Sequence, residues 1–365
     1  MNTTYRTHVV GSLLRPAYLT QARAQLDAGA ISPAEFKRVE DRAVDQAIAL
    51  QEGLGIDVIT DGEMRRFTFF DQLLTAVTGI SDVPAPPVQF FADDPSENIV
   101  FQSPESVTGE VTRRRMLTVE EFSYARARAR VPLKVTLPSP LMLYAVWSPE
   151  HTRAVYPDPF ELFRVGAELI REEVVELARL GCERVQIDAP EITVLVDEEQ
   201  KAHWEQLGIS TARVMTEGYE LIDSITDVPG VHFGLHLCRG NFESRWAGQG
   251  GYEAMSRELF NRCKGFDEYL LEYDSPRAGS FDALADAPDD KLVVLGLVST
   301  KQDELEDRAT IVSRIEDAAS RLPRDQLALS TQCGFASVAT GNNISEHGQE
   351  AKLRLVAEVA SQVWG

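Results

Sequence analysis

Two residues near the middle of the chain have the types and spacing of a metal site. His236 and Cys238 lie in residues 231–241, VHFGLHLCRGN, where apolar residues alternate and the chain then turns at a glycine, as a buried strand does where it leaves a sheet. Because residues two apart on a strand point to the same face, the imidazole and the thiol can hold one ion together. The same pair also occurs in ordinary packing, so a metal site requires further ligands from elsewhere in the chain.

Eight short β-rich runs predict the strands that would position such a site. Amphipathic stretches separate most of them, an order that predicts a parallel sheet covered by helices. Eight such units indicate an α/β fold of the (β/α)₈ type, the TIM barrel. The predicted strands are residues 7–10, 57–60, 133–137, 184–188, 231–237, 268–273, 291–298 and 326–330.

Helical periodicity predicts the elements between these strands. Ser32 and Pro33 have the types of a helix cap and first turn. Residues 79–130 contain several prolines and polar runs, which predicts an insertion, a hairpin over the barrel mouth rather than a second domain. We therefore expect residues 1–365 to form one barrel domain. The predicted helices are residues 33–54, 160–180, 210–225, 251–263, 304–322 and 345–363.

Chemically active residues follow most of the predicted strands. Since the strands of such a barrel end at one mouth, these side chains are expected to converge there. Two sulfurs, one imidazole and several carboxylates favour zinc over magnesium or calcium. In chain order, the strands end in Gly11-Ser12, Asp61-Gly62-Glu63, Asp188, His236-x-Cys238, Glu272-x-Asp274 and Cys333-Gly334.

Composition excludes several classes of partner. A formal net charge of -21 over 365 residues opposes binding to nucleic acid or to an anionic membrane surface. No apolar run is long enough for a signal peptide or a membrane-spanning helix, and four scattered cysteines fit a reducing compartment better than a disulfide framework. We expect a cytoplasmic protein with small-molecule partners; whether copies of the chain form a homo-oligomer is left open.

The series of strand ends resembles the catalytic barrel of the cobalamin-independent methionine synthases. The matching motifs are HVVGSLLRP, DVITDGEMRR, RVQIDAPE, GLHLCRGN, LEYDSPRAG and LSTQCGFAS, which span nearly the whole chain in the family's order. The resemblance implies a zinc-dependent S-methyltransferase that makes methionine from homocysteine. It also implies that the zinc ligands are His236, Cys238, Glu272 and Cys333.

The resemblance assigns the homocysteine site as well. It places the thiol substrate at Gly11 and Ser12, with Glu63 and Asp188 as the acidic residues that act on it. Two carboxylates can hold the substrate amino group, and the backbone N–H of Ser12 can hold its carboxylate. A free thiol is mostly protonated at pH 7, and coordination to Zn²⁺ removes that proton. Glu272 is the most replaceable of the four ligands when a second sulfur arrives.

Departures from the family concern the alkyl donor. The long synthases have an additional N-terminal half, so this chain resembles their single-barrel relatives. Val298, in LGLVSTK, stands where the long enzymes have a proton-donating His, and the family's Asp-Glu-Pro is Asp188-Ala-Pro-Glu191. A folate nitrogen needs a proton as it leaves, so methyltetrahydrofolate is predicted to be a slow donor unless another acid such as His8 acts; a corrinoid, a sulfonium or an epoxide would be faster. Trp147 is a candidate to stack on a pterin, or else a packed core residue.

Three other functions stay open at this point. The first is addition of coenzyme M to an epoxide, as in epoxyalkane:coenzyme M transferases, whose anionic thiol would need a basic clamp instead of Glu63 and Asp188. The second is a decarboxylase-like barrel related to uroporphyrinogen decarboxylase, which needs no zinc. The third is a non-catalytic metal-binding protein, which turnover of any thiol would exclude.

Overall fold

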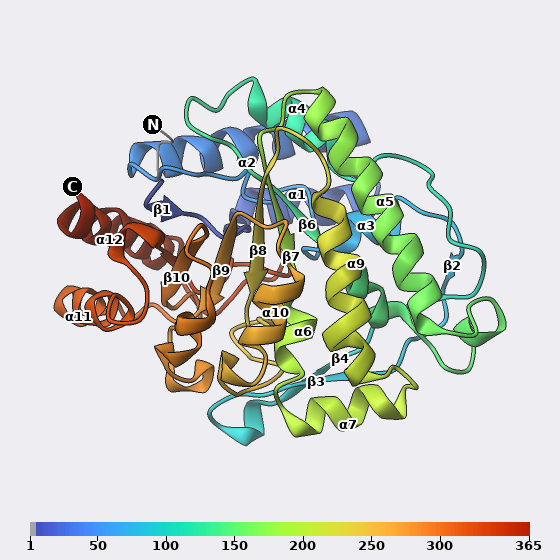
Figure 1. Cartoon of the computed structure of the whole chain (residues 1–365). Coiled ribbons are helices and arrows are strands. Elements are labelled where there is room, and N and C mark those ends of the chain that lie inside the picture. The colour runs from blue at the N-terminus through green and yellow to red at the C-terminus, as the bar shows by residue number, and fades with distance from the viewer. Residues whose placement is uncertain (1–4) are drawn as a thin grey trace.

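The computed structural model describes residues 5–365 and is built on one curved parallel sheet. All pairings within this sheet are parallel, in the order β1-β11-β10-β9-β8-β7-β6 (Figure 1). The α/β barrel fold expected from the sequence is confirmed. The strands are β1 (Thr7–His8), β6 (Val135–Pro138), β7 (Arg184–Asp188), β8 (His232–Leu237), β9 (Glu268–Glu272), β10 (Leu292–Val298) and β11 (Leu327–Thr331).

The strand predicted at residues 57–60 is wrong as a strand, although the segment does bridge the two edges of the sheet. Val58 pairs with His8, and Ile59 pairs with Leu133 just before β6, each as a single parallel bridge. Side chains replace the ladder on either side of these bridges. The Asp57 carboxylate accepts the N–H of Thr7 (3.0 Å), and the amide of Gln51 exchanges two hydrogen bonds with the backbone of Thr60.

Helices surround the sheet, and most predicted ones are present with shifted ends. Ser32 caps α2 in a capping box with Glu35, as its sequence indicates. The helix predicted at 210–225 is present as a continuous helical stretch over 211–226, in which a π turn η4 (Val214–Gly218) separates α8 from α9. The α-helices are α1 (Ala17–Asp27), α2 (Pro33–Gly53), α3 (Asp71–Thr75), α4 (Val119–Arg126), α5 (Pro159–Arg179), α6 (Pro190–Val194), α7 (Glu198–Gln206), α8 (Thr211–Arg213), α9 (Tyr219–Asp223), α10 (Ser256–Arg262), α11 (Arg308–Ala318) and α12 (Glu346–Trp364).

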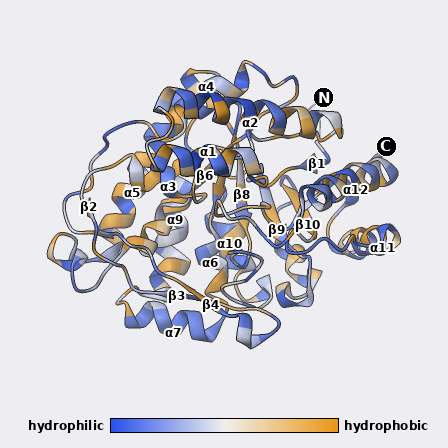
Figure 2. Ribbon diagram, turned by 180° about the vertical axis from the view of Figure 1, so that it is seen from behind, coloured by the Kyte–Doolittle hydropathy of each residue, from blue (hydrophilic) through white to orange (hydrophobic). Residues whose placement is uncertain are grey.

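Burial follows the layers. Every residue of β6, β9 and β11 is buried, because helices cover the outside of the sheet and side chains fill its inside. The helix α7 is largely hydrophilic in Figure 2 and buries only Gln200 and Trp204. It therefore lies at the rim of the barrel and not in its wall.

The segment at residues 79–130 covers the mouth as predicted only in part, because α4 near its end packs against α2 and α5 in the helical layer. Its strands pair antiparallel, β2 (Ile80–Ser81) with β5 (Ser106–Val107) and β3 (Val88–Phe90) with β4 (Ile99–Phe101). Figure 1 shows β3 and β4 near α7 at one end of the barrel. Phe90 and Phe101 pack against Phe242, with ring centroids 5.1 and 5.3 Å apart, and Phe242 follows β8, so the insertion is packed onto the strand that carries the His-x-Cys pair.

Candidate functional site

One cavity at the carboxyl ends of the strands brings together seven of the eight residues predicted for the site. The sheet alone explains this convergence, because Asp188 ends β7 and pairs directly with His236 on β8. The other strand ends reach the same cavity from around the barrel. The seven residues that line it are Gly11, Ser12, Glu63, Asp188, His236, Cys238 and Cys333.

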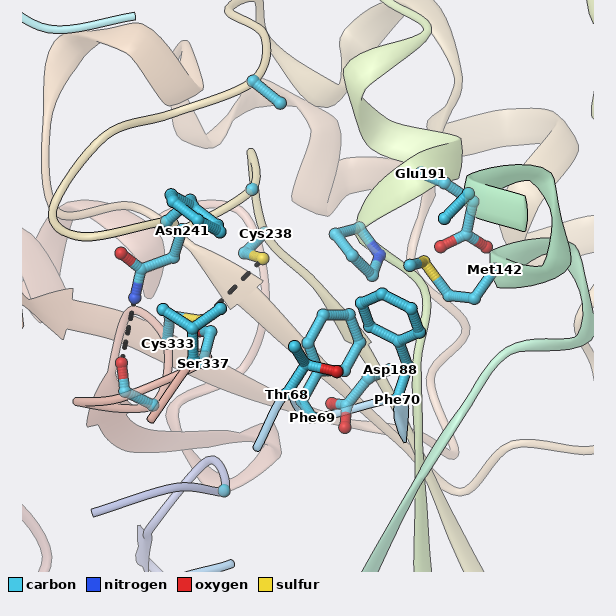
Figure 3. A pocket seen from close by; sticks show the side chains of 18 of the residues that line it. Thr68, Phe69, Phe70, Met142, Asp188, Glu191, Cys238, Asn241, Cys333 and Ser337 are labelled. Atoms are coloured by element: carbon cyan, nitrogen blue, oxygen red, sulfur yellow. Dashed lines mark hydrogen bonds between the residues drawn. The ribbon is translucent and has the colours of Figure 1, made fainter. Parts of the chain in front are cut away.

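Three of the predicted metal ligands form a compact cluster. The ligand atoms of His236, Cys238 and Cys333 all lie within 4.8 Å of one another, and the two sulfurs are 3.9 Å apart (Figure 3). All three side chains are buried, and neither imidazole nitrogen of His236 has a hydrogen-bond partner among the described residues. A buried imidazole without a partner beside two free thiols fits a metal of zinc's ligand preference.

The proton balance of this cluster also suits a cation. The contact between the thiols lowers the pKa of Cys333 well below its usual range and raises the pKa of Cys238. Burial by itself would lower the pKa of His236, but the neighbouring Cys333 outweighs it and raises that pKa. The cluster therefore holds protons that a bound metal ion would displace.

The fourth predicted ligand, Glu272, lies next to this cluster and makes other contacts. Its carboxylate is fully buried, and Oε2 accepts the backbone N–H of Arg239 at 2.7 Å. Oε1 lies 3.4 Å from Nζ of Lys301, which is also 3.2 Å from Asp274. Glu272 therefore contacts the residue that follows Cys238, lies outside the three-residue cluster, and has both of its oxygens held by other groups.

Glu63 reaches the cavity through a tight fit with the first strand end. Its Oε1 accepts a hydrogen bond from the hydroxyl of Thr136 (2.7 Å), and a Cβ atom on Gly11 would lie 2.6 Å from the same oxygen. Gly11 is therefore needed for the close approach. Glu63 itself has a φ of 53°, an uncommon backbone conformation that concentrates at functional sites, and burial raises the pKa of its carboxyl despite the nearby Arg66.

Asp188 is held by a buried polar chain that sequence reasoning missed. Lys134 donates to Oε1 of Gln186 (2.6 Å), and Nε2 of Gln186 donates to Oδ1 of Asp188 (2.7 Å). Because the lysine fixes which end of the amide accepts, the amide can only donate to the carboxyl. Burial raises the pKa of Asp188 to about 7 and lowers the pKa of Lys134 to about 8. Lys134 lies just before β6, and Gln186 and Asp188 lie in β7. The sequence pattern of each segment alone does not indicate that these side chains contact one another.

The same cavity contains another acid, Glu191, at the start of α6. The side chain is buried, and Oε1 accepts a hydrogen bond from the hydroxyl of Ser139. Its Oε2 has no partner among the described residues. Burial raises the pKa of this carboxyl to about 8, although Ser139 opposes the shift.

Much of the remaining lining is apolar and comes from α6, the 3-10 segment Pro140–Val146, the insertion and loops. None of these residues was expected at the site, because their chain segments lack strand or helix periodicity. The described lining includes no Lys or Arg. The apolar residues are Phe69, Phe70, Val88, Phe90, Phe101, Met142, Ala145, Val194, Phe242 and Val338.

Two candidates from the sequence lie away from the cavity. Trp147 is fully buried, and its indole N–H donates to the carbonyl of Leu207 (3.1 Å), so it is a packed core residue. His8 lies inside the barrel, 3.6 Å from Glu268, and burial lowers its pKa to about 3. His8 therefore does not line the cavity. Val298 is also fully buried and does not line the cavity.

None of the described helices combines the length and the apolar composition that crossing a bilayer requires.

Comparisons with known proteins cover almost the entire chain. Residues 5–361 match the family described as cobalamin-independent synthase, catalytic domain. The Bacillus subtilis protein YxjH, described as uncharacterized, is 32% identical over 99% of this chain and 95% of its own length. A 5-methyltetrahydropteroyltriglutamate–homocysteine methyltransferase of Mycobacterium tuberculosis is 29% identical over 65% of this chain, which corresponds to 29% of that protein. The crystal structure of a Listeria monocytogenes protein described as a putative vitamin-B12 independent methionine synthase superposes with a TM-score of 0.75 at 25% identity, covering 100% of this chain and 99% of that one.

Proposed function

Because the chain belongs to the family of cobalamin-independent synthase catalytic domains, we propose that it is a zinc-dependent methyltransferase that converts homocysteine to methionine. The observation that carries the proposal is the shared cavity. A His-Cys-Cys cluster, which can hold a metal, and two buried carboxyl groups, which can hold an amine, line the same cavity.

We assign the metal to His236, Cys238 and Cys333, with Glu272 as an exchangeable fourth ligand. Zinc, when bound, lowers the pKa of a coordinated thiol and so makes a sulfur nucleophile available at neutral pH. Both oxygens of Glu272 already have other partners, Arg239 and Lys301. These contacts would stabilise the carboxylate when it is not bound to the metal.

The chain's own residues would orient the amino acid. Glu63 and Asp188 are the groups that we expect to hold its ammonium group, and the backbone N–H of Ser12 the group that holds its carboxylate. In the reaction, the homocysteine sulfur forms a bond to the methyl carbon while the bond from that carbon to the donor breaks. The bonding electron pair stays with the leaving group, and the apolar part of the lining favours exclusion of water from the nucleophile.

The lining argues against coenzyme M as the acceptor. A sulfonate buried in this cavity would need a cationic partner, and the described lining residues include neither Lys nor Arg while they include Glu63, Asp188 and Glu191. An amino acid fits this charge distribution better than an anionic thiol.

The proposal is tested with purified, zinc-loaded protein. Homocysteine is incubated with 5-methyltetrahydropteroyl-triglutamate, S-methylmethionine or a methylated corrinoid, and new methionine is measured by mass spectrometry. Coenzyme M with a short epoxide is the parallel assay. Methionine formation that a chelator abolishes and zinc restores is the expected result. Full activity without metal, or turnover only of coenzyme M, would refute the assignment.

A further inference from the structure

Glu191 has one carboxyl oxygen without a hydrogen-bond partner in residues 5–365. It lies three residues beyond Asp188, in the first turn of α6, and is only 1% exposed. The Ser139 hydroxyl accepts the backbone N–H of Leu141 (3.1 Å) and donates its own proton to Oε1 of Glu191. A carboxyl proton is therefore best placed on Oε2, which has no protein partner among the described residues.

The position of this oxygen suits a proton donor to the leaving group. Glu191 lines the same cavity as the sulfur cluster. Figure 3 shows it beside Met142, on the other side of the view from Cys238 and Cys333. In a displacement at carbon, the nucleophile and the leaving group lie on opposite sides of the transferred methyl group. An acid across the cavity from the sulfurs is on the leaving-group side.

The surroundings keep this acid protonated. Met142 and Tyr144 belong to the wall on this side, and no described Lys or Arg reaches the lining. The titratable neighbours that face Glu191 are Asp188 and Tyr144, and neither carries a positive charge that would favour the carboxylate. A buried carboxyl with only a hydroxyl partner therefore favours its neutral form at pH 7.

We propose that Glu191 is the general acid that protonates a nitrogen leaving group during methyl transfer. This inference rests on the proposed function and names a catalytic residue and a class of donor for it, an N-methylated heterocyclic amine. The sulfur–carbon bond forms, the carbon–nitrogen bond breaks, and the electron pair left on nitrogen takes the proton from Oε2. Homocysteine releases its thiol proton when it binds, and Glu191 regains one from water after product release, so protons balance over the cycle.

Glu191 would take the role of the proton-donating His that the long enzymes have and this chain lacks. Val298 stands at the position of that His, which predicts slow use of a folate donor, and the alternative acid His8 does not line the cavity. Glu191 supplies an acid from a different strand end. The Val298 position predicts a slow folate donor, whereas an acidic Glu191 predicts a folate rate that depends on this carboxyl, and the two can be told apart by measurement.

The test compares wild type with Glu191→Gln, which keeps the shape but cannot give up a carboxyl proton. Single-turnover rates are measured on zinc-loaded enzyme saturated with homocysteine, with two donors. We expect the variant to be roughly 10²–10⁴-fold slower with 5-methyltetrahydropteroyl-triglutamate and to lose far less with S-methylmethionine, whose sulfide leaves without a proton. With wild type, only the folate rate should fall as pH rises through the pKa of about 8 for Glu191.

Equal losses with both donors, or none with the folate donor, would overturn the proposal. A second measurement does not depend on turnover. The infrared difference spectrum between wild type and Glu191→Gln at pH 7 should contain a carboxylic-acid carbonyl band, and a carboxylate band in its place would refute the assignment. If no donor methylates homocysteine, the proposed function fails while the infrared result still decides whether Glu191 can act as an acid.

Discussion

Replacement of Lys301 by methionine tests how the carboxylate next to the metal cluster is held. The Lys301 ammonium lies 3.4 Å from Glu272 and 3.2 Å from Asp274, and the three side chains are 9%, 0% and 2% exposed. Burial alone would lower the pKa of Lys301, but Asp274 and Glu272 outweigh it and raise that pKa above its usual range. The variant leaves two buried carboxylates without their shared cation.

The expected loss follows from these distances. At an effective dielectric constant of about 20, each contact corresponds to a gross attraction of about 5 kcal/mol, and the cost of burying the ammonium offsets part of the sum. Removing one member of a buried ion pair costs about 3–5 kcal/mol. We expect the free energy of unfolding of metal-free Lys301→Met to fall by that amount. Zinc should restore part of it and bind more tightly than to wild type, because the released Glu272 can then join the ligands.

Urea unfolding with chelator and with zinc measures both effects, and competition with a chelating dye measures zinc affinity. Lys201→Met is a matched control, since Lys201 pairs with Glu198 at 2.6 Å but the two side chains are 39% and 86% exposed. That pair should contribute less than about 1 kcal/mol. If the two variants lose the same stability without metal, the buried triad is not the stabilising unit. If zinc stabilises Lys301→Met and wild type equally, Lys301 does not compete with the metal for Glu272.

Three further predictions concern single carboxyl and thiol groups. Cys333→Ser should lose most of its zinc in elemental analysis, because Cys333 lies in the three-ligand cluster. Glu272→Gln should keep most of its zinc, because both Glu272 oxygens have other partners. Full zinc in Cys333→Ser would contradict the site. Glu63→Gln should bind homocysteine about 1.5–3 kcal/mol more weakly in calorimetry, the usual value of a charged hydrogen bond, with zinc retained, and unchanged affinity would favour another thiol. The Glu191 carboxyl has its pKa raised to about 8 in the folded protein, so between roughly pH 5 and 8 the folded state keeps a proton that the unfolded chain has released. As pH rises over that range, the free energy of unfolding of wild type should therefore fall by about 1.4 kcal/mol per pH unit relative to Glu191→Gln. A difference that does not change with pH would show that this carboxyl is already ionised in the folded protein.

The sequence by itself determined the fold class and the strand-end residues of the cavity, but not its apolar lining. Apolar runs fix where strands end, and in a parallel barrel all those ends meet at one mouth, so the positions of Asp188, His236, Cys238 and Cys333 followed from local patterns alone. The capping residues Ser32 and Glu35 likewise act within a few residues of each other, which is why the start of α2 could be read directly. The prolines of residues 79–130 indicated an insertion for the same local reason.

Tertiary structure decided what depends on distances between segments that are far apart in the chain. Residues 57–60 do not pair as a full strand because side chains bond to their backbone. Gln51 donates to the carbonyl of Thr60, and the hydroxyl of Thr7 accepts the N–H of Asp57. The contact of Lys301 with Glu272 spans 29 residues. It depends on the register of β9 and β10, which places Gly296 opposite Glu272. The free oxygen of Glu191 exists because Ser139, 52 residues earlier, holds the other one. Side-chain period within one strand specifies a face, but hydrogen bonding and burial between strands specify which groups on that face stay unpaired and can react.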